Sequence, residues 1–102
     1  MAGSHTLADL QAALTSRDPA RRMAAIQAAG SAPGVEQVLI AALADSNELV
    51  RVAAIRALGE LNEPKGVRAL IRAAAQDPSP RVRAEALAGL GRILEARTRG
   101  GH

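Results

Sequence analysis

The sequence contains no cysteine, phenylalanine, tyrosine or tryptophan, and its two histidines are His5 and His102. Without cysteine the chain can form no disulfide and offers no thiolate. Without aromatic rings it has no side chain on which a nucleic-acid base could stack. The two histidines lie at opposite ends of the chain, and no histidine–carboxylate cluster has the spacing of a metal site. We therefore expect no catalytic residue, no cofactor and no metal site, and we predict that the protein is not an enzyme.

The sequence also lacks an apolar run long enough to cross a membrane, and we expect no signal peptide. A cytoplasmic protein without membrane contact is the resulting prediction. The 102 residues suit a single domain. Because 48% of the residues are hydrophobic and none is aromatic, the core must be built from alanine, leucine, isoleucine and valine. Alanine lets helices approach closely but buries little area, so this core requires tight stacking.

One segment design occurs three times, over residues 16–30, 45–61 and 77–91. Arg22, Arg51 and Arg83 align, with offsets of 29 and 32 residues. Alanine, isoleucine or leucine, and finally glycine follow each arginine at matching positions. Self-similarity at this period is typical of a solenoid.

Each segment carries the start and end signals of a helix. The aligned first residues are good N-caps, and they are Asp18, Asn47 and Ser79. Proline follows two of them, at the first helical position where its missing N–H group costs nothing. Gly30, Gly59 and Gly91 align at the end and suit a left-handed C-cap, although the two later helices could continue past their glycine.

The apolar spacing predicts an outer helix before each of these inner helices. The expected outer helices span residues 6–15, 35–44 and 65–76, and the inner helices span residues 18–29, 47–61 and 79–96. The three residues added in the second interval lie between Gly59 and Val67, and they indicate an added helical turn before Asn62. We predict one domain over residues 6–96, with repeats at 6–30, 34–61 and 65–96 and flexible termini at 1–5 and 97–102.

The pattern D-x-x-x-x-V-R-x-x-A-x-x-A-L-G resembles the HEAT repeat. The matching residues are Asp45, Val50, Arg51, Ala54, Leu58 and Gly59 in the second segment, and Asp77, Val82, Arg83, Ala86, Leu90 and Gly91 in the third. The short period is similar to that of the bacterial phycobilisome-lyase-type HEAT-like repeats. The first segment departs, because Ser16 and Arg21 stand where aspartate and valine are expected. The resemblance implies an all-α, right-handed α-solenoid of three HEAT-like helix pairs, about six helices.

The resemblance also implies a structural ladder between repeats. In it Arg22, Arg51 and Arg83 each bond a turn aspartate or a carbonyl of the adjoining repeat. Asp45 and Asp77 are the natural acceptors, since arginine offers five donors in a planar fork. Ser16 at the aspartate position leaves the contact at the first repeat open.

In HEAT-like stacks the inner helices line the concave face. Eight residues are predicted to face that groove, namely Met23, Gln27, Val52, Arg56, Glu60, Ala84, Ala88 and Arg92. The resulting surface is small, mixed and partly apolar, which suits a peptide or helix of another protein. We therefore predict a non-enzymatic protein-interaction or scaffold module.

A second hypothesis is weak, sequence-nonspecific binding of a nucleic-acid backbone through the basic C-terminal third. The formal net charge is +3, and most of the basic excess lies after residue 62. The arginines concerned are Arg68, Arg72, Arg81, Arg92, Arg97 and Arg99. Interleaved acidic residues and the lack of aromatic side chains rank this hypothesis below protein binding.

Two further alternatives have less support in the sequence. A bilin-lyase-like enzyme subunit is suggested only by the name of the repeat, and the sequence offers no candidate acid, base or nucleophile for it. A designed scaffold would be expected to have regular repeats, whereas the offsets of 29 and 32 residues are unequal.

The end helices carry apolar residues that no dedicated cap covers. The first outer helix has Leu7, Leu10 and Leu14, and the last inner helix has Leu87, Leu90, Ile93 and Leu94. Because a solenoid needs polar terminal faces, we predict self-association through the end helices.

Overall fold

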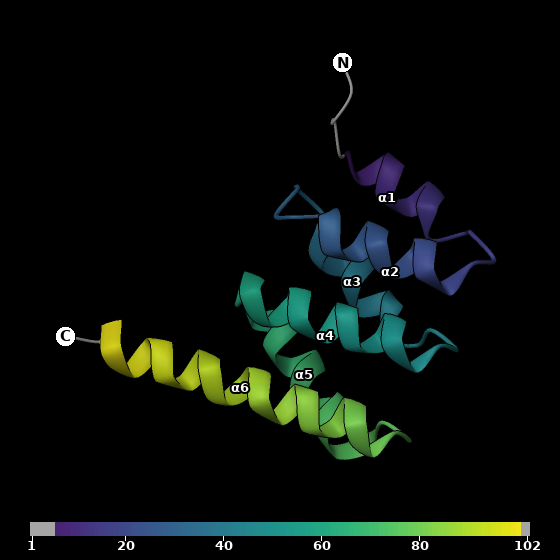
Figure 1. Cartoon of the computed structure of the whole chain (residues 1–102). Coiled ribbons are helices and arrows are strands. Elements are labelled where there is room, and N and C mark those ends of the chain that lie inside the picture. Colours follow the sequence, from purple (N-terminus) through teal and green to yellow (C-terminus); the bar gives the residue numbers. More distant parts are fainter. Residues whose placement is uncertain (1–5, 101–102) are drawn as a thin grey trace.

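Six helices and no strand make up the part of the chain that the computed structural model describes, residues 6–100 with the side chains of residues 6–99 (Figure 1). In chain order they are α1 (Leu7–Ala13), α2 (Pro19–Ala28), α3 (Val35–Ala42), α4 (Glu48–Leu61), α5 (Pro64–Gln76) and α6 (Pro80–Gly100). The all-α, solenoid-like fold predicted from the repeats is thereby confirmed. Of the termini predicted to be flexible, residues 1–5 and 101–102 lie outside the described residues.

The helices stack in chain order, in two layers (Figure 1). The inner helices α2, α4 and α6 lie side by side in one layer, and α4 contacts both of the others. The outer helices α3 and α5 lie behind them, and α1 packs against α2 at the N-terminal end. The Cα atoms extend over 42 × 32 × 17 Å. The molecule is therefore a flat, elongated stack with α4 at its centre.

The inner helices begin at the three predicted N-caps. The Asp18 carboxylate accepts a hydrogen bond from the N–H group of Ala20 at 2.9 Å, and the side-chain oxygen Oδ1 of Asn47 accepts one from the N–H group of Leu49 at 2.8 Å. The Ser79 hydroxyl accepts a longer bond, 3.3 Å, from the N–H group of Val82. Each cap satisfies a first-turn donor that has no partner inside its helix.

The three inner helices end at different positions of the repeat. Gly30 follows α2 with φ +64°, so the first glycine ends its helix as predicted. Gly59 and Gly91 lie inside α4 and α6, and Asn62 takes the left-handed C-cap of α4 with φ 52°. The predicted extra turn before Asn62 is therefore present. The predicted end of the last inner helix at residue 96 was wrong, because α6 continues to Gly100.

The core follows the stack and is densest around α4. Six residues of this helix are buried, namely Val50, Val52, Ala53, Ala54, Ile55 and Leu58. They join buried residues of the other helices, such as Ile26 in α2 and Leu39 in α3, in one continuous cluster. Because α4 has an inner helix on each side, alanines suffice to fill the space between neighbouring backbones.

An arginine ladder joins successive repeats along one edge. Nε and Nη2 of Arg22 donate to both carboxylate oxygens of Asp45, at 2.9 and 3.0 Å, and Nη1 donates to the carbonyl oxygen of Ser16 at 2.8 Å. Arg51 repeats this geometry, with Asp77 at 3.0 and 3.2 Å and the carbonyl oxygen of Asp45 at 2.8 Å. Each guanidinium thus binds the aspartate of the following repeat and the turn of its own.

The ladder is present at the first repeat, where the sequence left it open. Ser16 supplies only the carbonyl oxygen in this contact, and the carboxylate comes from Asp45 of the second repeat. The hydrogen bond to Asp45 raises the pKa of Arg22. Both side chains are mostly shielded from solvent, so this pair fixes the spacing between α2 and α4.

Candidate partner-binding groove

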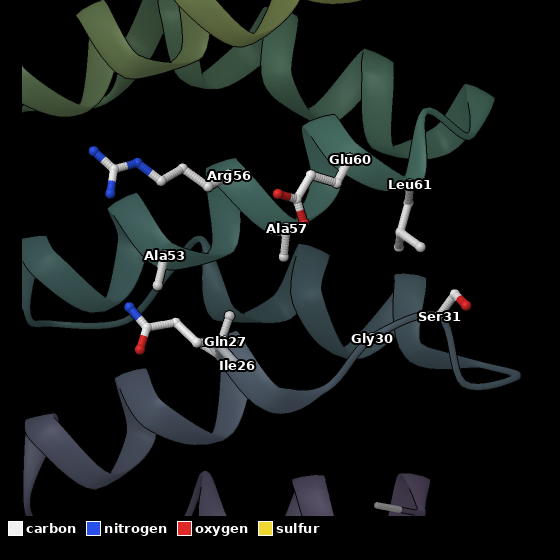
Figure 2. A pocket seen from close by; sticks show the side chains of 9 residues that line it. All are labelled: Ile26, Gln27, Gly30, Ser31, Ala53, Arg56, Ala57, Glu60 and Leu61. Atoms are coloured by element: carbon white, nitrogen blue, oxygen red, sulfur yellow. The ribbon is translucent and has the colours of Figure 1, made fainter.

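Two adjoining hollows lie along the inner helices, and we call them together the inner-helix groove. The first, of about 490 Å³, lies between α2 and α4 (Figure 2). Its lining residues are Ile26, Gln27, Gly30, Ser31, Ala53, Arg56, Ala57, Glu60 and Leu61. The second, of about 590 Å³, lies between α4 and α6 and is lined by Arg56, Gly59, Glu60, Asn62, Glu85, Ala88, Arg92, Ile93 and Ala96.

Side chains of α4 link the two hollows. Arg56 and Glu60, one turn apart on this helix, line both of them. In Figure 2 the alanines Ala53 and Ala57 project from α4 toward α2, beside Gln27. The groove therefore has small apolar residues between its helices and charged groups on its central ridge.

Five of the eight predicted groove residues line these hollows, namely Gln27, Arg56, Glu60, Ala88 and Arg92. Met23 is half-buried and packs against the core, and Ala84 is exposed but lines neither hollow. The assignment of Val52 to a partner-binding surface was wrong, because only 4% of this residue is exposed. It belongs to the core since α4 is covered from both sides.

An ion pair crosses the second hollow from α4 to α6. Nε and Nη2 of Arg56 donate to the two carboxylate oxygens of Glu85 at 3.3 and 3.0 Å. This bidentate contact lowers the pKa of Glu85, and it raises the pKa of Arg56. Arg56 remains more than half exposed. Its charge is therefore largely balanced, but much of its side chain stays accessible to a partner.

Glu60 and Arg92 hold the remaining charges of the groove, and neither forms an ion pair within residues 6–100. The amide side chain of Gln27 is exposed in the first hollow. The side-chain oxygen of Asn62 accepts a 3.3 Å bond from Nη2 of Arg97 beside the second. Such groups can bind the backbone and charged side chains of a peptide.

The groove also contains residues that come from helix ends and from the pairing of helices, and these were not predicted from the sequence. Ser31 and Leu61 lie where α2 and α4 end, and Ala96 lies in the last turns of α6. Glu85, by contrast, could have been predicted, because its position in the repeat carries a signal in the sequence. It occupies the position of Ala53 in the preceding repeat, and a charge at an alanine position of an inner helix indicates a partner on the neighbouring helix.

The described residues hold no group of three or more histidine, cysteine, aspartate or glutamate side chains that could bind a metal ion. In the same part of the chain, no helix is long and apolar enough to span a membrane. What the groove offers is a set of hydrogen-bonding and charged groups around small apolar side chains.

A family model described as HEAT repeats matches residues 35–99, which is more than half of the chain. The match covers the second and third helix pairs as far as residue 99, and the first pair, α1 and α2, lies outside it. No curated protein and no solved structure matches the chain.

Proposed function

Because the chain belongs to the HEAT repeat family, whose repeats are commonly protein-interaction scaffolds, we propose that it is a non-enzymatic module that binds another protein. The bound element is a peptide or a helix, and it lies in the inner-helix groove. The observation that carries this proposal is that two hollows adjoin along the inner helices, with Arg56 and Glu60 lining both of them. Short peptides and single helices are recognised in grooves of this kind through a few anchoring side chains.

The groove residues indicate what the partner should look like. Ala57 and Ala88 are small, so a partner backbone or an aliphatic side chain can approach closely. Glu60 favours a basic side chain and Arg92 an acidic one, since opposite charges set orientation and register across an interface. We therefore expect a mixed-charge, partly apolar segment rather than a uniformly acidic one.

Two finer assignments stay predictions. The family match does not distinguish the short bacterial variety that the sequence resembles. The cytoplasmic location likewise stays a prediction from the sequence.

The test is an affinity pull-down with mass spectrometry, performed with and without nuclease, on the parent chain and on Glu60→Lys. Glu60 lies on the ridge shared by both hollows, so the variant should lose nuclease-resistant protein partners. A nucleic-acid module would instead keep or gain binding, because an acidic residue becomes basic.

The matched control is Glu95→Lys. This residue is exposed on α6, carries the same charge change and lines neither hollow. It should retain the partners that Glu60→Lys loses. Equal recovery of proteins by both variants, or recovery of nucleic acid alone, would contradict the proposal.

A further inference from the structure

We propose that copies of this chain stack head to tail, with the C-terminal end of one copy packed on the N-terminal end of the next. The C-terminal face consists of Arg83, Leu87 and Leu94 on α6. The N-terminal face consists of Ala24 and Ala28 on α2, with the hollow between α1 and α2. This contact would continue the repeat stack from one molecule into the next, and it is independent of the inner-helix groove.

The C-terminal face exposes a side chain whose aligned counterparts are buried in the other two repeats. Ile26, Ile55 and Leu87 align in the three repeats. Ile26 is 1% exposed and Ile55 is 0% exposed, whereas Leu87 is 60% exposed. Ile26 and Ala53 of the following repeat line the same hollow and belong to the same core cluster. Leu87 differs because no following repeat covers it within the described residues.

Leu94 extends this apolar face along α6. It lies seven residues after Leu87, which places both side chains on the same side of the helix. It is exposed as well. A stripe of two large exposed aliphatic side chains is the surface that a further helix pair would cover.

The N-terminal face presents the complementary position. Ala24 and Ala28 align with Ala53 and Ala57, the α4 residues that face the preceding repeat. Ala53 is buried, whereas Ala24 and Ala28 are exposed. These two alanines help to line a hollow of about 360 Å³ between α1 and α2. Leu87 of one copy can therefore pack on Ala24 and Ala28 of another as Ile26 packs on α4 within the chain.

The arginine ladder explains why this contact should be weak. Within residues 6–100, Arg83 donates only to the carbonyl oxygen of Asp77, at 2.7 Å, and it has no carboxylate partner. In a head-to-tail stack the carboxylate would come from the position of Asp45 and Asp77, which in the first repeat is Ser16. The stack thus lacks its charged contact, so association requires high protein concentration.

Ser16 nevertheless accepts the same local hydrogen bond as the aspartate at this position of the second repeat. Its hydroxyl accepts a hydrogen bond from the N–H group of Asp18 at 3.1 Å, as the carboxylate of Asp45 does from Asn47 at 2.8 Å. An aspartate at position 16 can therefore form the same turn, and Ser16→Asp should fold as the parent does.

A two-fold contact between C-terminal faces is disfavoured by charge. Helix α6 carries Arg81, Arg83, Arg92, Arg97 and Arg99 against Glu85 and Glu95. Two copies of this helix would bring like charges together. A head-to-tail contact joins two different faces instead, and such contacts grow into open chains unless the rotation closes a ring.

The test measures association by sedimentation and light scattering from micromolar to millimolar protein. The parent should form a concentration-dependent series of species. Ser16→Asp should associate about tenfold or more tightly, because it supplies two charge-assisted hydrogen bonds to Arg83 of the neighbouring copy. This gain should shrink at high salt, and it should disappear in the double variant Ser16→Asp with Arg83→Gln.

A separate substitution tests the apolar part of the contact. Leu87→Ser should weaken association severalfold without unfolding the chain, because Leu87 is mostly exposed. Leu49→Ser is the matched control, since Leu49 is an exposed leucine on the central helix α4 and should have no effect.

A mass that stays monomeric in both the parent and Ser16→Asp would overturn the proposal. So would a dimer that never grows, or a Ser16→Asp gain that survives Arg83→Gln. Glu60→Lys, which disrupts the inner-helix groove, should leave association unchanged, so the two proposals fail separately.

Discussion

At the scale of single residues, the aspartate in the turn before the inner helix of the second and third repeats serves two neighbours at once. One carboxylate oxygen of Asp45 caps the turn by accepting from the N–H group of Asn47, and both oxygens bind Arg22 of the preceding repeat. Although partial burial opposes ionisation, the hydrogen bonds from Arg22 and Asn47 hold the pKa of Asp45 below its ordinary value. Local structure and repeat-to-repeat contact therefore depend on the same charge.

Asp45→Asn tests that charge through pH. A carboxyl whose folded pKa is lowered stabilises the fold fully above its unfolded pKa, and this contribution is lost as the pH falls through the folded pKa. At neutral pH the variant should be less stable than the parent by about 1 kcal/mol or more. The difference should shrink as the pH falls below 3.8, the ordinary pKa of this carboxyl. Urea unfolding of both proteins across this range measures it.

The control for this prediction is Glu95→Gln, which removes an exposed carboxylate that forms no ion pair in the described part of the chain. It should change stability little at any pH. A stability difference for Asp45→Asn that is the same in acid and at neutral pH would show that the ionised carboxylate is not what joins the repeats.

The ladder also shows what the sequence could and could not predict at this scale. Asp45 and Asp77 were predicted as acceptors, and they are. The doubt about the first repeat arose from comparing Arg22 with Ser16 of its own repeat. The arginine reaches forward to the next repeat, a direction that depends on how the helices stack and not on the pattern within one segment.

At the scale of helices, close approach determines where glycine is required. The N–H group of Gly66, in the first turn of α5, donates to a carboxylate oxygen of Glu36 on α3 at 3.0 Å. A Cβ atom on Gly66 would lie 3.1 Å from Cδ2 of Leu58, a side chain that is fully buried and cannot easily move. Gly91 of α6 is the opposite case, with nothing within 4 Å of such an atom.

These two glycines form a matched pair of variants. Gly91→Ala should stabilise the protein by about 0.5–1 kcal/mol, because alanine favours the helix and nothing obstructs its side chain. Gly66→Ala should fail to stabilise it, since the same gain is offset by overpacking against Leu58. Thermal unfolding at low protein concentration, where association is minimal, measures both. Equal stabilisation by the two variants would mean that Leu58 has room to shift.

The number and order of the helices followed from caps and apolar spacing, and so did the end of α4 at Leu61, but the end of α6 at Gly100 did not. Gly59 and Gly91 occupy the position of Gly30, yet only the first glycine ends its helix. Leu61 and Ile93 pack against the core beyond those glycines. Tertiary packing thus extends the later helices past a local stop signal. The three added residues indicated this for α4, whereas no pattern in the sequence marked how far α6 continues.

At the scale of the whole molecule, burial falls from the centre of the stack toward its ends. This decrease in burial explains why only some of the predicted groove residues line the groove. Helical phase placed Gln27, Arg56 and Arg92 correctly, because exposed positions of an inner helix share one side. The same phase failed for Val52, since aligned positions differ in burial according to how many neighbours their repeat has.

The distribution of basic side chains over the molecule bears on nucleic-acid binding. The arginines proposed for a backbone contact are spread over two helices, with Arg68 and Arg72 on α5 and the others on α6. All are exposed. On α6 they alternate with Glu85 and Glu95, and Glu85 already pairs with Arg56. The positive field is therefore diluted, and no aromatic side chain is present to stack a base.

We expect nucleic-acid binding, if it is measurable, to be weak and the same for different sequences. Because counterion release drives such binding, the affinity should fall steeply as salt is raised. Fluorescence anisotropy with labelled single-stranded and duplex DNA over a salt series is the measurement. Glu95→Lys should strengthen the binding and Arg81→Glu should weaken it, since each changes the local charge on exposed positions of α6. Tight, sequence-selective binding at physiological salt would require base contacts that this surface does not offer, and it would place nucleic acid ahead of protein as the partner.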